Sequence, residues 1–230
     1  ILLDGKALSE KIKEEVKVEV AQLVEEKQIT PGLAVILVGN DAASATYVAS
    51  KAKSCKNAGI YSVVHEMPES ITQEELLETI ARMNENPKLD GILVQLPLPK
   101  HIDTTVVLEA IDPLKDVDGF HPYNVGRMVS NLDAFLPATP FGVMRMFQEY
   151  GIELSGKNVV VIGSSDIVGK PMASLLINAK ATVTVCNSRT KDLASHTKAA
   201  DIVVIAVGVP YLLKADMVKD GAIVIDVGIN

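Results

Sequence analysis

Asn158-Val159-Val160-Val161-Ile162-Gly163-Ser164-Ser165-Asp166-Ile167-Val168-Gly169 is the stretch that decides the fold of the second half of the chain. It is typical of a buried strand that enters a glycine-containing turn and continues into a helix, here expected from about Ile167 to Asn178. The turn departs from the strict G-x-G-x-x-G pattern, because serine stands at the second glycine position. A helix start still offers free N–H groups and a positive dipole end to a phosphate, so the turn indicates a dinucleotide site. An ordinary strand-to-helix turn is the alternative.

Three more strands are predicted after this unit. They lie at Thr182–Cys186, Asp201–Ala206 and Ala222–Val227, with a helical segment around Leu193 to Ala199 between the first two. This order is typical of half of a Rossmann-type, dinucleotide-binding fold.

The residues after the first of these strands bear on the choice of cofactor. In Cys186-Asn187-Ser188-Arg189-Thr190 there is no acid at the point where an NAD-specific fold presents one to the ribose hydroxyls. Arg189 could instead pair with a ribose 2'-phosphate, and Ser188 and Thr190 could donate hydrogen bonds to it. A solvated surface arginine is the alternative.

Helices and buried strands also alternate in the first half of the chain. Apolar residues at three- and four-residue steps predict a helix over residues 8–24, and the apolar run Leu33–Val38 predicts a strand covered on both faces. We then expect a helix from Ala42 to Ala58 closed by Gly59, a strand from Tyr61 to Glu66, a helix that a Thr72–Glu75 capping box opens and Asn86-Pro87 ends, and a strand from Gly91 to Gln95. This alternation predicts a mostly parallel sheet, with ligands at the carboxyl ends of its strands, Gly39-Asn40 and Gln95-Leu96-Pro97.

The two halves are expected to be separate domains of an α/β protein. Between Ile111 and Pro140 the periodicity fades, and Asp, Pro, Gly and Asn accumulate as in a domain connection. We place the domains at residues 1–137 and 138–230. Thr139-Pro140 is predicted to be an N-cap followed by proline at the first position of a helix that ends near Gly151.

Composition excludes several classes of function. The 230 residues carry 29 acidic and 22 basic side chains, a net charge of −7, with no dense basic run, which argues against nucleic-acid or anionic-membrane partners. No apolar stretch approaches the roughly 18 residues that span a bilayer, and the first six residues show no signal-peptide pattern. Cys55 and Cys186 lie in no metal-like spacing, so we expect neither a disulfide nor a metal site, and a cytoplasmic location is the default.

One face of the predicted 42–58 helix carries unusual residues for a core. Ser44, Tyr47 and Lys51 share that face because they stand at i, i+3 and i+7. Tyr47 and Lys51 could place a phenol beside an amine at the mouth of the sheet, near Gln95. A surface lysine that extends its apolar stem beside a half-buried tyrosine is the alternative, and the spacing alone favours it.

Lys115-Asp116-Val117-Asp118-Gly119 lies in the connection between the halves. Its carboxylates could bind metal, form turns, or accept hydrogen bonds from a cationic or amide-like ligand. Asp116 is more typical of turn formation. The ligand spacing and terminal Glu of an EF-hand are absent, and His121 has no second ligand at metal spacing.

Together these residues resemble one enzyme family. The chain is similar, over essentially its whole length, to the bifunctional methylenetetrahydrofolate dehydrogenase/cyclohydrolases, through the segments Asp4-Gly5-Lys6, Tyr47 with Lys51, Gly91–Pro99, Lys115–Gly119, Pro137–Pro140 and Ile167–Pro171. The long motifs around Gln95 and Asp118 make the resemblance specific.

The resemblance implies a folate-binding domain and a Rossmann domain with a cleft between them. It implies that hydride passes from 5,10-methylenetetrahydrofolate to NADP, and that water then opens the methenyl product to 10-formyltetrahydrofolate, a reaction sequence of one-carbon metabolism and purine biosynthesis. It also implies a cytoplasmic homodimer.

The resemblance further implies roles for individual residues. Lys51 is the catalytic amine, Gln95 holds it, Tyr47 packs on the aromatic ring of the folate, and Asp118 binds the amidine edge of the pterin, with Ser44 and Pro97 also in the substrate site. The implied cofactor contacts are Gly163, Ser164, Ser165, Ile167, Val168, Ser188, Arg189, Thr139, Gly208 and Ile229. No metal is implied.

Three departures from the family limit these expectations. Many relatives have Arg where this chain has Ser164 and His where it has Asn187, so the phosphate contacts at these two positions are expected to differ from those of the relatives. The family also continues past Asn230 with a Pro-Gly-Gly loop and a helix that packs on the first domain, so we expect a piece of a longer protein or a truncated one. The alternatives for function are an NADP-dependent dehydrogenase without cyclohydrolase activity and a non-catalytic dinucleotide-binding module.

Overall fold

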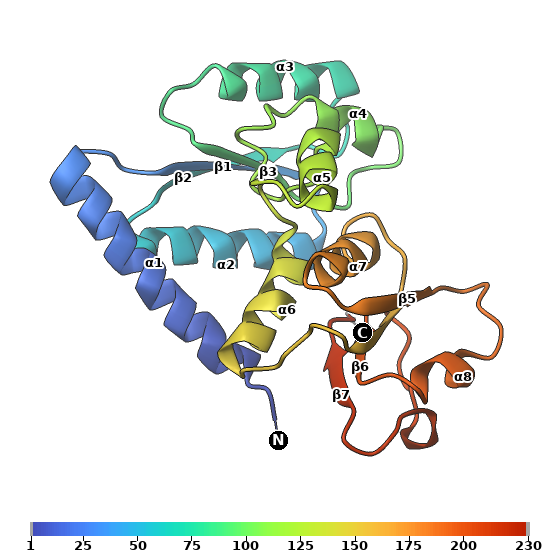
Figure 1. Ribbon diagram of the computed structural model, residues 1–230. Coiled ribbons are helices and arrows are strands. Elements are labelled where there is room, and N and C mark those ends of the chain that lie inside the picture. Colours follow the sequence, from blue (N-terminus) through green and yellow to red (C-terminus); the bar gives the residue numbers. More distant parts are fainter. Residues whose placement is uncertain (1, 229–230) are drawn as a thin grey trace. The chain divides into compact units, whose positions relative to one another are not determined.

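The computed structural model describes residues 2–228 and divides into two compact units, residues 2–123 (the first unit) and the residues from 124 onward (the second unit). Each unit is built on its own parallel sheet (Figure 1). The predicted α/β fold class is therefore confirmed. The domain limits placed at residues 137 and 138 stay a prediction.

The first unit alternates strands and helices. Its elements are α1 (Gly5–Lys27), β1 (Gly32–Val38), α2 (Ala42–Ala58), β2 (Tyr61–Met67), α3 (Gln73–Asn84), β3 (Gly91–Val94) and α4 (Thr104–Glu109), and α5 (Pro122–Val129) begins at its end. The strands lie in the order β2-β1-β3, all parallel. Because β1 is flanked by strands on both sides, the carboxyl ends of β1 and β3 meet at the point where the strand order reverses, which is where ligands bind in such sheets.

The central strand is buried on both faces, as its apolar run predicts. Ala34, Ile36 and Val38 of β1 pack with α3 and α4 in one cluster, while Val35 and Leu37 pack toward Val48 of α2 in another. Figure 1 shows α3 and α4 on one side of this sheet and α1 and α2 on the other. The strand can be apolar at every position because helices cover both sides of it.

Local signals set the helix ends of the first unit. The Asp4 side chain accepts hydrogen bonds from the first turn of α1, and the predicted capping box between Thr72 and Glu75 opens α3. Gly59, at φ 79°, closes α2 in the left-handed conformation expected of it. The predicted bounds of α2 are confirmed to the residue.

The second unit holds the predicted Rossmann-type half. Its elements are α6 (Ala138–Glu149), β4 (Asn158–Ile162), α7 (Gly169–Asn178), β5 (Thr182–Cys186), α8 (Leu193–Thr197), β6 (Ile202–Ile205), the 3-10 turn η1 (Ala215–Met217) and β7 (Ile223–Asp226). The parallel strands lie in the order β5-β4-β6-β7, so the reversal point lies beside the carboxyl end of β4.

The prediction for the start of α6 is wrong. The helix begins at Ala138, its N-cap is Pro137, and the Pro137 carbonyl accepts from the N–H of Phe141 at 2.9 Å. Thr139 therefore lies inside the first turn, and Pro140 stands at the third helical position. Proline is tolerated there because the first four N–H groups of a helix have no partner within it.

Two short helices in the first half and the connection were not predicted. α4 has six residues and α5 has eight, too few for a clear periodicity. α5 lies inside the segment taken for an irregular connection, and it contains Asn124 and Gly126, which are poor helix formers. Burial of Asn124 and Met128, one turn apart, supports the helix by packing.

Two absences hold for residues 2–228. No helix there is both long and apolar enough to cross a bilayer. The same residues include no group of three or more His, Cys, Asp or Glu side chains arranged to hold a metal ion.

Candidate active site

Helix α2 carries the polar face that begins the site. Its N-cap Asp41 accepts a hydrogen bond from the Ser44 N–H at 2.7 Å, and this bond together with one from the Ser44 hydroxyl lowers the pKa of Asp41. The buried Ser44 side chain is thus used in the cap. One turn on, Tyr47 is 54% exposed, which leaves its ring free to stack.

The next turn of α2 brings Lys51 to the end of β3. The Lys51 Nζ donates to Gln95 Oε1 at 3.0 Å, and Gln95 Nε2 donates to the Leu96 carbonyl at 2.8 Å. The Gln95 backbone N–H donates to the Ile36 carbonyl of β1 at 2.9 Å. Both the amide group and the backbone of Gln95 are therefore fixed, and the amide oxygen holds the amine in a defined place.

The loop that carries Asp118 runs beside β3 in the same direction as the strand. Ile92 and Asp116 form an isolated parallel bridge, in which the Ile92 N–H donates to the Lys115 carbonyl at 2.7 Å. The pairing ends there, because the segment turns and the Gly119 N–H donates to the Asp116 carbonyl at 3.1 Å. Asp118 lies in this turn, where the charge of Lys51, the partner of Gln95, acts on its carboxylate.

The two carboxylates of this loop have different surroundings. Asp116 is 1% exposed and accepts the N–H groups of Phe120, at 3.3 Å, and His121, at 2.8 Å, so it forms the predicted turn. Asp118 is partly buried, and no residue of the described part of the chain donates a hydrogen bond to its carboxylate. Burial raises the pKa of Asp118 to about 6, against a lowering effect of the Lys51 charge and with a further raising effect of Asp116.

The structure therefore gathers most of the predicted substrate residues at one edge of the first unit. Lys51, Gln95 and Asp118 lie together, Tyr47 is one helical turn from Lys51, and the exposed Pro97 follows Gln95. An exposed ring, an anchored amine and a carboxylate that has no donor of its own can bind a flat heterocycle with N–H groups and move a proton beside it.

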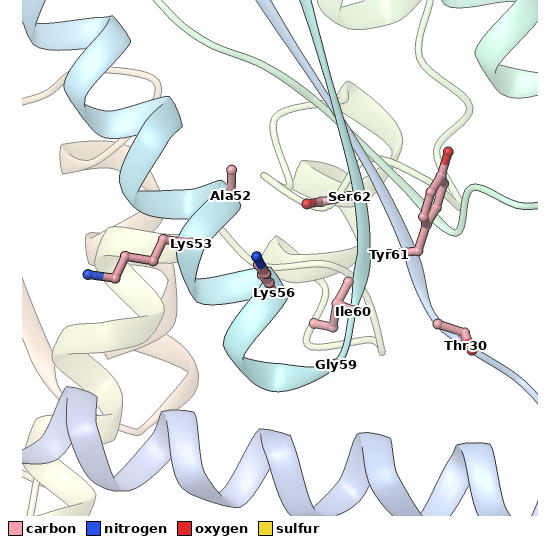
Figure 2. Close-up of a pocket in the computed structure, with 8 residues that line it drawn as sticks. All are labelled: Thr30, Ala52, Lys53, Lys56, Gly59, Ile60, Tyr61 and Ser62. Carbon is pink, nitrogen blue, oxygen red and sulfur yellow. The ribbon is translucent and has the colours of Figure 1, made fainter.

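A separate pocket of about 640 Å³ lies at the other end of α2. Figure 2 shows its lining, which comes from the last turns of α2, the start of β2 and Thr30, and includes none of the predicted site residues. Lys53 and Lys56 point in different directions there, so their amines do not form a paired cationic site.

In the second unit, Gly163 ends β4 beside the loop that follows β6. Its φ is +124°, and a Cβ atom on it would lie 2.5 Å from the Ala206 carbonyl oxygen. The two loops at the reversal point of the sheet therefore approach each other as closely as backbone allows. Only glycine fits both the conformation and the contact.

The turn after Gly163 presents backbone donors. Ser165 Oγ accepts the N–H groups of Val168 and Gly169, each at 3.3 Å, and so caps the start of α7. The N–H groups of residues 164–167 have no hydrogen-bond partner in the described part of the chain. Ser164 is partly exposed, and Ile167 is exposed at the outer side of the turn.

The loop after β5 forms a closed turn that displays Ser188 and Arg189. The Asn187 N–H donates to Thr190 Oγ1 at 2.9 Å, and the Arg189 N–H donates to Asn187 Oδ1 at 2.9 Å. Asn187 and Thr190 thus hold the turn, while Ser188 and Arg189 are exposed at its tip. The Arg189 guanidinium has no partner in the described residues.

Three other predicted cofactor residues lie elsewhere. Thr139 is exposed in the first turn of α6, and Gly208 is exposed in the loop after β6. Ile229 lies outside the described residues.

These features fit a dinucleotide. The free N–H groups of residues 164–167 at the start of α7 suit a pyrophosphate, and the missing Cβ of Gly163 lets a ligand approach the backbone at the reversal point. The exposed Arg189 at the end of the neighbouring strand suits a further phosphate.

Sequence reasoning missed one residue that shapes the site. The Lys115 amine donates to backbone carbonyls at the end of α3. The only signal was its place at the start of the Asp118 motif, because the carbonyls it binds lie about 30 residues earlier.

Comparisons with known proteins agree with this arrangement. Residues 3–118 match the model of the tetrahydrofolate dehydrogenase/cyclohydrolase catalytic domain, and residues 137–230 match the NAD(P)-binding domain of that family. The bifunctional protein FolD of Aliarcobacter butzleri is 91% identical over 230 residues, which are 100% of this chain and 80% of the relative.

Solved structures give the same result. The bifunctional enzyme FolD of Campylobacter jejuni has a TM-score of 0.98 at 55% identity, covering 100% of this chain and 82% of that one. FolD of Trypanosoma brucei, complexed with NADP cofactor and inhibitor, has a TM-score of 0.95 at 41% identity, covering 99% and 78%. Because both domain models match and a relative is 91% identical over the whole chain, the chain belongs to the tetrahydrofolate dehydrogenase/cyclohydrolase family.

Proposed function

We propose that this protein oxidises 5,10-methylenetetrahydrofolate to 5,10-methenyltetrahydrofolate with NADP and then hydrolyses that product to 10-formyltetrahydrofolate. The observation that carries the proposal is the Lys51–Gln95 hydrogen bond of 3.0 Å beside the unpartnered Asp118 carboxylate, in a chain of this family. An amine, an amide and a carboxylate in this arrangement serve both recognition and proton transfer.

Asp118 and Tyr47 bind the folate. The amidine edge of a pterin offers adjacent N–H donors, which a carboxylate accepts together much as it accepts a guanidinium. The exposed ring of Tyr47 packs on the aromatic part of the substrate. Pro97, exposed after Gln95, forms the rim of the same edge, and the Ser44 cap holds the first turn of α2 in place.

Lys51 handles the protons of the hydrolytic step. Water adds to the bridging methenyl carbon and loses one proton, which gives a neutral hydroxyl adduct. The bond from that carbon to one folate nitrogen then breaks as the hydroxyl loses its remaining proton to become the formyl oxygen, and the released nitrogen gains a proton, so the whole step releases one proton. One positioned amine can take the first proton and give the second. Gln95 holds the amine for both events, because its own amide is fixed by the Leu96 carbonyl.

The second unit binds the dinucleotide. NADP, when bound, supplies the carbon that accepts the hydride. The N–H groups of residues 164–167 and the Ser164 and Ser165 side chains contact its phosphates, with Gly163, Ile167, Val168, Thr139 and Gly208 around it. Arg189 and Ser188 bind the ribose 2'-phosphate, which favours NADP over NAD.

We also propose that the protein works in the cytosol as a homodimer. The free thiols of Cys55 and Cys186 support a reducing compartment. We assign the contact between two copies to the edge strand β5 and the neighbouring helix α7, where Val185 and Ile177 are exposed. Light scattering of the purified protein tests the dimer.

Two assays on the same preparation test the proposed activities. One follows NADPH formation from methylenetetrahydrofolate, and the other follows loss of methenyltetrahydrofolate in the absence of NADP. Both are expected to be positive. NADPH formation alone would leave the alternative of a dehydrogenase without cyclohydrolase activity, and NADP binding with neither activity would leave a non-catalytic binding module.

A further inference from the structure

The side chain of Lys115 joins the Asp118 loop to the carboxyl end of α3. Its Nζ donates to the carbonyl oxygens of Asn84, at 2.7 Å, and Asn86, at 3.0 Å, and lies 3.5 Å from that of Met83. The last carbonyls of a helix have no partner within the helix and carry its negative dipole end, so an ammonium group suits them well. The three N–H bonds of the amine are used in this contact.

Other contacts hold the same segment against β3. The Lys115 carbonyl accepts the Ile92 N–H at 2.7 Å, and the Val117 side chain occupies the space above Gly91, where an added Cβ would lie 2.5 Å from Val117 Cγ1. The Lys115 side chain points to α3, and the Val117 side chain packs with the cluster on the α2 side of the sheet. The segment is therefore fixed on both faces just before Asp118.

Asn84 provides a second anchor from the same helix end. Its Nδ2 donates to the Ala110 carbonyl at 2.8 Å, and its Oδ1 accepts the Asp112 N–H at 2.9 Å. The connection from α4 to Lys115 is thus fastened at its start by Asn84 and at its end by Lys115. Neither side chain lies at the edge where Lys51 and Gln95 meet.

We propose that Lys115 is a positioning residue for folate recognition, which sets the place of the Asp118 carboxylate by holding its loop on the end of α3. The inference rests on the proposed function, because it assigns Asp118 to the pterin edge. A carboxylate that accepts two donors together requires a fixed direction, and a loop free to shift by about 1 Å would lose that match. Lys115 acts only through Asp118 and touches no reacting atom.

A purely structural role for Lys115 makes a different prediction. If the amine only stabilised the fold, its loss would lower the fraction of active molecules, and so the apparent kcat, while KM would not change because only folded molecules contribute to it. A positioning role raises the KM for the folate and leaves kcat and the KM for NADP unchanged. Measuring kcat and the KM for the folate separately therefore distinguishes the two roles.

The experiment compares three variants of the full chain in the dehydrogenase assay. Lys115→Met keeps the stem and removes the amine, and it is expected to raise the KM for methylenetetrahydrofolate about tenfold, the loss of roughly one charge-assisted contact. Lys115→Arg retains a cation with several donors and is expected to recover most of the affinity. Lys88→Met is the matched control, because Lys88 is exposed in the next turn and its amine has no partner in the described residues.

Asn84→Ala provides an independent test through the other anchor. It is expected to raise the KM for the folate as Lys115→Met does, again with the KM for NADP unchanged. An unchanged folate KM in Lys115→Met would overturn the proposal, and so would an equal loss for folate and NADP. Failure of the wild type to turn over methylenetetrahydrofolate would instead contradict the proposed function.

Discussion

The Lys51 amine is held by the Gln95 amide oxygen at 3.0 Å, and these residues lie 44 positions apart in the chain. Lys51 comes from the middle of α2, whereas Gln95 follows the last residue of β3. The Gln95 amide cannot rotate without breaking its own bond to the Leu96 carbonyl. The first unit thus offers a preorganised amine at the edge of its sheet.

Replacing Lys51 is expected to separate the two activities. The hydrolytic step needs a group that takes and gives a proton, whereas hydride transfer needs only that the folate and nicotinamide be held in contact. Lys51→Met is therefore expected to lower cyclohydrolase activity by roughly a hundredfold to ten-thousandfold and to leave measurable dehydrogenase activity. The two assays described above measure this on one preparation.

Lys53→Met is the matched control for that experiment. Lys53 lies two residues further along α2, is exposed and lines the pocket of Figure 2 at the far end of the helix. Both activities are expected to survive in it. Wild-type hydrolysis by Lys51→Met would remove Lys51 from the proton transfer, and loss of both activities together would reduce it to a residue that positions the substrate.

Gly163 is expected to tolerate no side chain. An alanine there would combine φ +124° with a Cβ only 2.5 Å from the Ala206 carbonyl oxygen, at a cost of roughly 1 to 3 kcal/mol from the backbone conformation alone. Gly142→Ala in α6 meets nothing within 4 Å and is expected to stabilise by about 0.5 to 1 kcal/mol. Thermal unfolding of both variants measures these changes in stability, and NADP titration measures their effect on the cofactor site. Equal stability of the two variants would contradict the close packing at Gly163.

The sequence predicted the order and type of most elements because strands and helices here obey strong local rules. The apolar run of β1, the capping box of α3 and the terminal Gly59 of α2 each act over a few residues. α5 was not predicted because its residues have low helix propensity, and burial of the Met128 side chain stabilises it instead. Thr139 is a residue type typical of an N-cap, but the first hydrogen bond of α6 joins the Phe141 N–H to the Pro137 carbonyl, so the helix begins two residues before the predicted start.

The site was harder to predict, because its contacts join distant segments. The spacing of Tyr47 and Lys51 alone favoured a surface pair, and only the family resemblance assigned Lys51 to chemistry. No local pattern shows that the segment before Asp118 pairs with β3, so the approach of Asp118 to Gln95 required the fold itself. The contact of Lys115 with the end of α3 was missed for the same reason.

Arg189 is expected to set the preference for NADP. Its guanidinium lies exposed at the tip of a turn that Asn187 and Thr190 hold closed. A charge-assisted contact with the 2'-phosphate is worth roughly 1.5 to 3 kcal/mol, or about tenfold to a hundredfold in affinity. Arg189→Glu should therefore remove the preference, as the ratio of kcat/KM for NADP and NAD would show.

Lys191→Glu provides the matched control for Arg189. It makes the same change of charge two residues away, on another exposed side chain. If it removes the preference as fully as Arg189→Glu does, the effect is one of overall charge and not of a specific contact. A wild type that uses NAD better than NADP would contradict the assignment directly.

The ionised Asp118 carboxylate is expected to lower the stability of the ligand-free protein and to strengthen folate binding. Burial raises its pKa from 3.8 to about 6, so the folded protein holds this proton more tightly than the unfolded chain. The contribution of Asp118 to stability is therefore greatest below pH 4 and declines as the pH rises to about 6, after which the full cost of burying the charge applies. Asp118→Asn removes that cost and should raise the stability of the ligand-free protein at pH 8 by about 1 to 3 kcal/mol.

Folate affinity should depend on pH in the opposite direction. Only the ionised carboxylate can accept two N–H donors of the pterin edge, so binding should be constant above pH 7 and weaken by up to about tenfold per pH unit below pH 6. Asp118→Asn presents a single oxygen acceptor beside an NH₂ group, so it should bind the folate weakly at every pH. The change of folate affinity near pH 6 should disappear in this variant, and its affinity for NADP should be unchanged. Titrations with tetrahydrofolate and with NADP between pH 5 and pH 8, on both proteins, measure these effects. If folate affinity still changes near pH 6 in Asp118→Asn, another group is responsible for the pH dependence. If the variant binds the folate as tightly as the wild type does, Asp118 only forms part of the turn.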